Sequence, residues 1–177
     1  EPVEQEIGSD LEDLEGPSPR TRFFEDTSRS LITYNDSPDV GFSASVNPYR
    51  GCEHGCIYCF ARPTHEYFGL SASLDFETQI FVKENAPALL RRELAAAKWK
   101  PQVLAMSTVT DPYQPIEGKY ELTRRCLEVL LKKRNPIGLV TKGTLAVRDA
   151  DLLAELTNEA GCTLCFSITT LNNDLWQ

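Results

Sequence analysis

The sequence lacks features that would assign it to a membrane or to a basic nucleic-acid-binding class. Its 177 residues contain no run of 18 apolar residues, which excludes a helix that crosses a membrane. Positive charge is scarce: 18 Lys and Arg face 26 Asp and Glu, for a net charge of −8, and this balance argues against a general polyanion binder. The chain is also too short for a complete eight-fold β/α barrel, which needs about 250 residues.

The N-terminal segment has no basic start and no aromatic residue. Residues 1–16 hold seven acidic residues and no Lys or Arg, so residues 17–177 have a net charge of only −1. Because a targeting signal needs a basic start and an apolar stretch, we expect a disordered acidic leader over residues 1–20. Residues 21–43 show few periodic signals, and we expect them to form an irregular N-terminal extension.

The six cysteines are not spread along the chain as they are in a small extracellular disulfide scaffold. Three fall within eight residues, a pattern that favours reduced thiols and a cytoplasmic location. Cys126 lies on the apolar face of an expected helix, where free cysteine is commonly buried. Cys162 and Cys165 are spaced like a metal or redox pair, but no second pair lies nearby, and we expect a structural role for both.

From residue 102 onward, short apolar runs alternate with amphipathic helices. We expect strands over 103–106, 137–141 and 163–168, and helices over 121–133 and 149–160. This order predicts an α/β fold of parallel strands joined by right-handed crossovers. Earlier in the chain we expect strands over 42–46 and 79–83, and a helix that begins after Asn85. Since the last strand precedes any covering helix, residues 44–177 are expected to form the N-terminal part of a larger domain.

Residues 51–60, GCEHGCIYCF, space three cysteines as C-x3-C-x2-C: Cys52, Cys56 and Cys59. Gly51 and Gly55 are poor helix formers, so we expect a loop that curls three thiolates around one centre. Structural zinc usually takes four ligands, and His54 is expected to point elsewhere. Three thiolates on a four-iron cluster would leave one iron without a protein ligand, and an exogenous group would have to bind there.

This segment resembles the radical S-adenosylmethionine (radical SAM) superfamily. The hallmark of that family is C-x3-C-x-aromatic-C, and Tyr58 stands at the aromatic position. The wider stretches NPYRGCEHGCIYCFARPTHEY, TDPYQPIE and TKG are similar to a bacterial subgroup related to spore photoproduct lyase. The resemblance covers about residues 40–177. It implies a partial (β/α)6 barrel, of which this chain holds only the first strands and helices.

The resemblance also implies the chemistry. In the family, Cys52, Cys56 and Cys59 would hold a [4Fe–4S] cluster, and the amino and carboxylate groups of SAM would chelate the fourth iron. Reduction, by an electron donor such as flavodoxin or ferredoxin, would cleave SAM to methionine and a 5′-deoxyadenosyl radical that abstracts hydrogen from the substrate. The likeness to spore photoproduct lyase points to a lyase or DNA-repair reaction. However, the sequence has no basic strip for nucleic acid and identifies neither substrate nor hydrogen donor.

Polar residues follow each predicted strand, where β/α barrels place their active sites. By the resemblance, Thr110 and Asp111 lie near the methionine end of SAM, and Lys142 pairs with its carboxylate. Ser167 would bond to the same region or to the ribose, and Tyr58 would lie beside the adenine. For each of these residues the alternative is a loop cap, simple packing or a solvated surface group.

The Gly-Gly-Glu segment common in the superfamily is absent after the second strand, and Glu117 is the expected substitute partner of the SAM amino group. Four further residues flank the cysteine loop and would either tune a cluster or form surface ion pairs: Arg50, Arg62, His65 and Glu66. The competing hypothesis is a non-enzymatic module in which the three cysteines bind zinc or a structural iron–sulfur cluster and contact nucleic acid.

Overall fold

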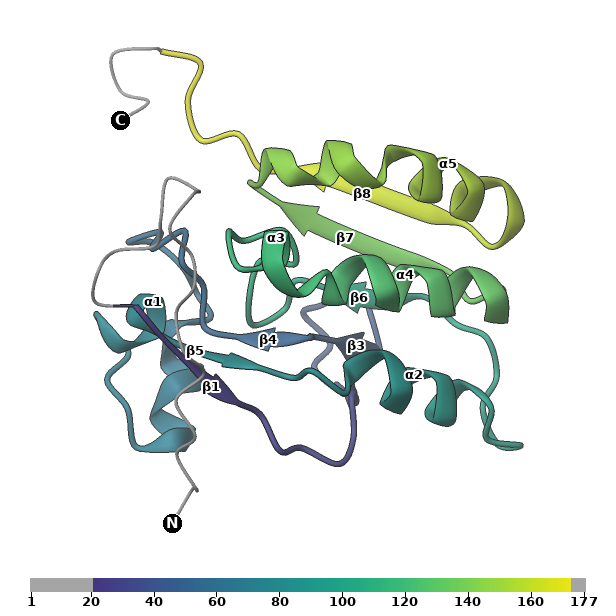
Figure 1. Ribbon diagram of the computed structural model, residues 1–177, viewed down its shortest axis with the longest axis horizontal. Coiled ribbons are helices and arrows are strands. Elements are labelled where there is room, and N and C mark those ends of the chain that lie inside the picture. Colours follow the sequence, from purple (N-terminus) through teal and green to yellow (C-terminus); the bar gives the residue numbers. More distant parts are fainter. Residues whose placement is uncertain (1–20, 173–177) are drawn as a thin grey trace.

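A five-stranded mixed sheet forms the larger part of the computed structural model, which describes residues 21–172. The acidic leader expected over residues 1–20 lies outside the described residues. In order across the sheet the strands are β2 (Ile32–Tyr34), β3 (Ala44–Val46), β6 (Leu104–Met106), β7 (Ile137–Thr141) and β8 (Cys162–Phe166). The last four run parallel, as Figure 1 shows for β7 and β8. Strand β2 pairs with β3 in the antiparallel sense.

Three helices cover one face of this sheet: α2 (Ala86–Leu94), α4 (Leu122–Lys133) and α5 (Ala150–Glu159). Their apolar stripes pack onto the strands, and Leu90, Leu127 and Leu156 have no exposed surface. Cys126 is equally buried in this core, which confirms the packing role expected for it. Each parallel strand therefore presents alternate side chains to the helices and to the opposite face.

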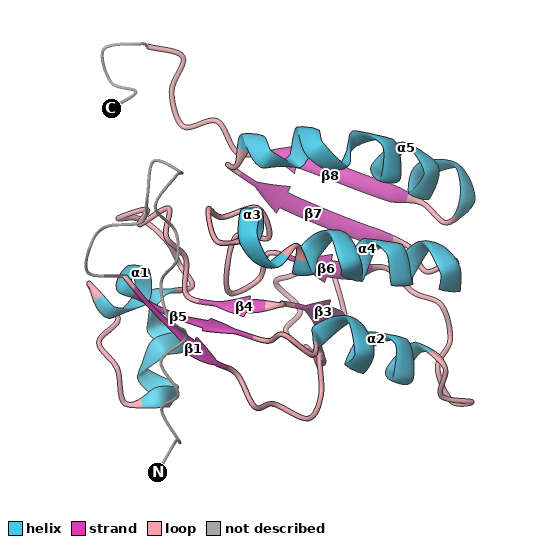
Figure 2. Ribbon diagram, in the orientation of Figure 1, coloured by secondary structure: helices cyan, strands magenta, loops and turns pink. Residues whose placement is uncertain are grey.

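A second, three-stranded sheet stands beside the first (Figure 2). Its order is β1 (Arg22–Glu25), β5 (Gln79–Val82) and β4 (Tyr49–Arg50). Between β4 and β5 the chain forms the cysteine loop, a 3-10 helix over Arg62–Phe68 and the short α1 (Asp75–Thr78). A small core joins this sheet to the segment around Ile116 and to the start of α4. The cysteine loop thus follows a strand whose Tyr49 side chain is fully buried in this core.

The predicted elements from residue 79 onward are confirmed to within two residues at their ends. Residues 21–43 differ from the expected irregular extension, because β1 and β2 lie there. These strands have only four and three residues, too few to show a period, and they owe their conformation to pairing with β5 and β3. The α/β fold is confirmed, whereas closure into a (β/α)6 barrel stays a prediction. Within residues 21–172, no helix is long and apolar enough to span a bilayer.

Candidate functional site

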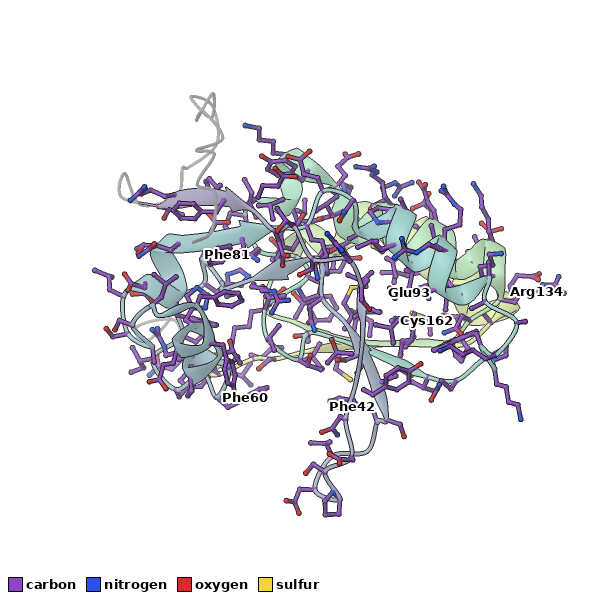
Figure 3. All side chains as sticks on the ribbon, turned by 90° about the horizontal axis from the view of Figure 1, so that it is seen from below. Phe42, Phe60, Phe81, Glu93, Arg134 and Cys162 are labelled. Atoms are coloured by element: carbon purple, nitrogen blue, oxygen red, sulfur yellow. The ribbon has the colours of Figure 1, made fainter. Side chains whose placement is uncertain are left out.

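A cavity of about 910 Å³ lies against the face of the five-stranded sheet that the helices leave open. Its floor carries the side chains that alternate away from the helices, such as Ala105, Val140 and Cys165. The cysteine loop and the β2–β3 hairpin form its walls. Figure 3 shows Phe60 of the loop and Phe42 of the hairpin on the side of the sheet away from the helices.

All three cysteines of the C-x3-C-x2-C motif line this cavity: Cys52, Cys56 and Cys59. The segment is a loop, as predicted, and Gly51 and Gly55 take positive φ angles of 81° and 59°. Cys52 is buried, and burial raises the pKa of its thiol to about 12. The other two thiols are half-buried. One short loop therefore presents three thiols to a single space.

The three thiols line one space without converging on a single point. Within residues 21–172, no three His, Cys, Asp or Glu side chains converge on one metal position, as a tetrahedral zinc site requires. A four-iron cluster binds each thiolate through a different iron, so its ligands need to surround a volume and not a point. All three thiols border the same cavity, which agrees with that requirement.

Gly51 is a position where any side chain would disturb the loop. A Cβ there would stand 2.8 Å from the carbonyl oxygen of Phe76 and 2.9 Å from Cε1 of His65. We expect Gly51→Ala to lower the free energy of unfolding by about 2 kcal/mol, because strain from positive φ adds to the clash. Urea unfolding measures this change. In Gly41→Ala, where nothing lies within 4 Å, we expect a change under about 0.5 kcal/mol; equal losses in both variants would contradict the account.

Arg62 holds the middle of the cysteine loop. Its guanidinium donates to the carbonyl oxygens of Cys56 at 3.0 Å, Gly55 at 2.7 Å and Ser73 at 2.6 Å. The same group pairs with the Glu77 carboxylate at 2.8 Å. Only the planar fork of arginine can satisfy this many acceptors at once. Arg62 was expected either to tune a cluster or to form a surface ion pair. It forms an ion pair, and together with the hydrogen bonds this pair holds the loop in position.

Lys142, Ser167 and Tyr58, each expected to contact SAM, lie together at the cavity. Lys142 follows β7, and its Nζ donates to Ser167 Oγ at 3.3 Å and stands 5.1 Å from the centre of the Tyr58 ring. A hydrogen bond with Tyr58 raises the pKa of Lys142, so the amine carries its charge at neutral pH. All three side chains line the cavity and leave a cation available to an anionic ligand there.

Asp111 also lines the cavity, but its carboxylate is occupied by the protein. Oδ1 accepts hydrogen bonds from Thr141 Oγ1 at 2.5 Å and from the Tyr113 N–H at 2.8 Å. Oδ2 accepts from the Lys142 N–H at 2.8 Å and lies 3.6 Å from His54 Nε2. The carboxylate therefore ties the loop after β6 to the end of β7. His54, expected to point elsewhere, forms part of the cavity wall.

Thr110 is likewise engaged, and Glu117 is not at the cavity. The Thr110 hydroxyl donates to the Gly51 carbonyl oxygen at 2.5 Å. Glu117 begins α3 (Glu117–Tyr120) with no exposed surface, and it accepts from the Tyr49 hydroxyl at 2.5 Å and pairs with Arg148 at 2.8 Å. It does not line the cavity. Its expected contact with the SAM amino group is therefore unsupported, because interior partners already satisfy the carboxylate.

Several residues at the site were not anticipated. The β2–β3 hairpin lines the cavity through Tyr34, Val40 and Phe42, in a region that shows few periodic signals. Cys165 is exposed and faces the cavity, although a packing role was expected for it. Gln114 is fully buried beneath the cysteine loop. Its position in the TDPYQPIE stretch was the available signal, but that stretch does not show what the amide contacts.

Comparisons with known proteins agree with this geometry. The family profile of the radical SAM superfamily matches residues 46–177. An uncharacterized protein of Mycobacterium tuberculosis is 42% identical over 134 residues, which is 76% of this chain and 39% of that protein. An uncharacterized protein of Methanocaldococcus jannaschii is 33% identical over 131 residues, 73% of this chain and 47% of that protein.

A more distant relative, an uncharacterized protein of Acidianus two-tailed virus, is 28% identical over 150 residues, 80% of this chain and 48% of that protein. The chain therefore spans less than half the length of these relatives. No solved structure matches it significantly. The profile match includes the cysteine loop and the ends of β6, β7 and β8 at the cavity, and it leaves out β1 and β2.

Proposed function

The chain belongs to the radical SAM superfamily, and from this premise we propose that it forms the cluster-binding and SAM-binding part of a radical enzyme. In this proposal Cys52, Cys56 and Cys59 hold a [4Fe–4S] cluster. One observation carries this proposal. Three thiols of a short loop line the same cavity as polar residues at the ends of three parallel strands. Such a cluster, once reduced, would supply the one electron needed to cleave the C–S bond of SAM, which gives methionine and a 5′-deoxyadenosyl radical.

The remaining residues at the cavity bind and orient. The Lys142 ammonium pairs with the SAM carboxylate, and Ser167 Oγ, 3.3 Å from that amine, donates to the same end of the ligand or to the ribose. The exposed ring of Tyr58 offers a face on which the adenine stacks. Asp111 and Thr110 act through the backbone: they hold Lys142 and the cysteine loop in place. The apolar floor of the cavity limits the water that would quench a radical.

The reductant and the substrate belong to the same proposal. A low-potential one-electron donor of the flavodoxin or ferredoxin kind supplies the electron. A lyase or DNA-repair reaction is the finer hypothesis that the likeness to spore photoproduct lyase suggests. Among the described residues that line the cavity, Lys142 is the only Lys or Arg. That single cation gives little support to a nucleic-acid substrate, which would need several phosphate contacts.

The proposed role of Lys142 is tested by Lys142→Met. We expect the dissociation constant for SAM to rise about tenfold, because a charge-assisted hydrogen bond contributes about 1.5–3 kcal/mol. Calorimetry on the anaerobically reconstituted protein measures the affinity. Lys132→Met removes a lysine from the exposed side of α4 and serves as the matched control. Unchanged SAM affinity in Lys142→Met would contradict the assignment.

The proposed reaction is tested by product formation. The chain, reconstituted with iron and sulfide and reduced with dithionite, is expected to convert SAM to 5′-deoxyadenosine and methionine, which chromatography quantifies. A colourless protein that carries one zinc ion per chain and leaves SAM intact would instead support the non-enzymatic alternative.

A further inference from the structure

Gln114 lies beneath the cysteine loop with no exposed surface. Its side-chain oxygen accepts a hydrogen bond from the N–H of Glu53 at 3.0 Å. Its side-chain nitrogen donates to the carbonyl oxygen of Gly51 at 3.3 Å and to the Thr110 hydroxyl oxygen at 2.8 Å. A primary amide can donate and accept at the same time. Gln114 thus bonds to the residue before Cys52 and to the residue after it.

Two other contacts strengthen the same connection. The Thr110 hydroxyl donates to the Gly51 carbonyl oxygen at 2.5 Å, so that oxygen accepts from two side chains. The Glu53 carboxylate accepts from the N–H of Ile116 at 2.8 Å. Gly51 and Glu53, the residues on the two sides of Cys52, are therefore tied to residues 110–116 through four hydrogen bonds, three to their backbone and one to the Glu53 side chain.

This connection controls the surroundings of the Cys52 sulfur. The backbone N–H groups of His54 and Asp111 donate hydrogen bonds to that sulfur. One of these N–H groups belongs to the residue after Glu53 and the other to the residue after Thr110. Glu53 and Thr110 are the two residues to which the Gln114 side chain bonds besides Gly51. N–H donors at a cluster sulfur favour the reduced, more negative state, and such bonds set cluster potentials.

We propose that Gln114 is a positioning residue that fixes Cys52 and its two N–H donors and thereby raises the reduction potential of the cluster. The inference rests on the proposed function, since it requires that Cys52 bind a cluster. It assigns Gln114 no contact with SAM or substrate. The side chain acts through the backbone of the cysteine loop, and the property that it changes is the reduction potential of the cluster.

Gln114→Met tests this role, because methionine has about the same length and volume as glutamine but cannot form the hydrogen bonds of the side-chain amide. We expect the equilibrium constant for reduction of the cluster to fall about tenfold. For a one-electron couple this is a shift of the reduction potential by about 59 mV to a more negative value. A redox titration followed by electron paramagnetic resonance measures it. The matched control is Gln102→Met, a half-buried glutamine outside the cavity, which is expected to keep the wild-type potential.

The outcomes separate this inference from the proposed function. A wild-type chain that takes up no iron overturns both. If the wild-type chain binds a cluster, and Gln114→Met has full iron content and an unshifted reduction potential, only the role of Gln114 is overturned. If circular dichroism shows that Gln114→Met is unfolded, Thr110→Val takes its place, since it removes the second donor to Gly51 and conserves shape. The same negative shift there supports the inference, and a wild-type potential overturns it.

Discussion

Replacement of Cys56 by Ala is expected to abolish both iron–sulfur cluster binding and SAM cleavage. Cys56 is half-buried in the cavity wall, between Cys52 and Cys59 in the loop. Two remaining thiolates cannot hold a cluster that otherwise has three protein ligands. Iron and sulfide content, the visible absorbance of the reconstituted protein and 5′-deoxyadenosine formation are the measurements, and all three are expected to fall to background.

The matched control is Cys162→Ala. Cys162 packs partly buried against the main core and does not line the cavity. Its replacement by Ala is expected to keep the cluster and to cost about 1 kcal/mol or less of stability. Full iron content and retained SAM cleavage in Cys56→Ala would refute the ligand assignment. Equal loss of the cluster in both variants would show that reconstitution, and not ligation, had failed.

Replacement of Glu117 by Gln is expected to lower the free energy of unfolding by about 3 kcal/mol, because it breaks a buried ion pair. The carboxylate accepts from the Tyr49 hydroxyl at 2.5 Å, Arg148 Nη2 at 2.8 Å and the Thr123 N–H at 2.9 Å. Glutamine is neutral and turns a donor toward groups that are themselves donors. Urea unfolding of the apo protein measures the loss.

Glu121→Gln is the control for this change. Glu121 lies near the same Arg148 at 3.9 Å, but its carboxylate is 52% exposed, and such a pair contributes about 0–1 kcal/mol. We therefore expect little change in its unfolding curve. If Glu117→Gln unfolded like the wild type but bound SAM more weakly, Glu117 would be a SAM ligand after all.

The sequence predicts the part of this fold that depends on local pattern. The strand over 137–141 has the expected bounds, because its apolar run is bracketed by a proline and by polar residues. Gly51 and Gly55 predict a loop at the cysteines, and both take positive φ angles. The polar residues after the parallel strands gather at one cavity, as strand direction alone requires.

The contacts made by individual side chains depend on residues far apart in the chain. Glu117 is polar and close to the TDPYQ stretch, which made it a reasonable ligand, but Tyr49 lies 68 positions away and Arg148 lies 31. Asp111 stands at the expected place, yet Thr141 and the Lys142 N–H occupy its oxygens. Gln114 bonds to Glu53, 61 positions earlier. Local spacing locates such groups but does not show which partners satisfy them.

The most direct test of the account is the electron paramagnetic resonance spectrum of the dithionite-reduced, reconstituted protein, recorded with and without SAM. Three cysteine ligands and one iron open to SAM predict the signal of a reduced four-iron cluster whose shape changes when SAM is added. A cluster signal that SAM leaves unchanged would contradict the open iron. A protein that shows no such signal and holds one zinc ion per chain would contradict the cluster itself.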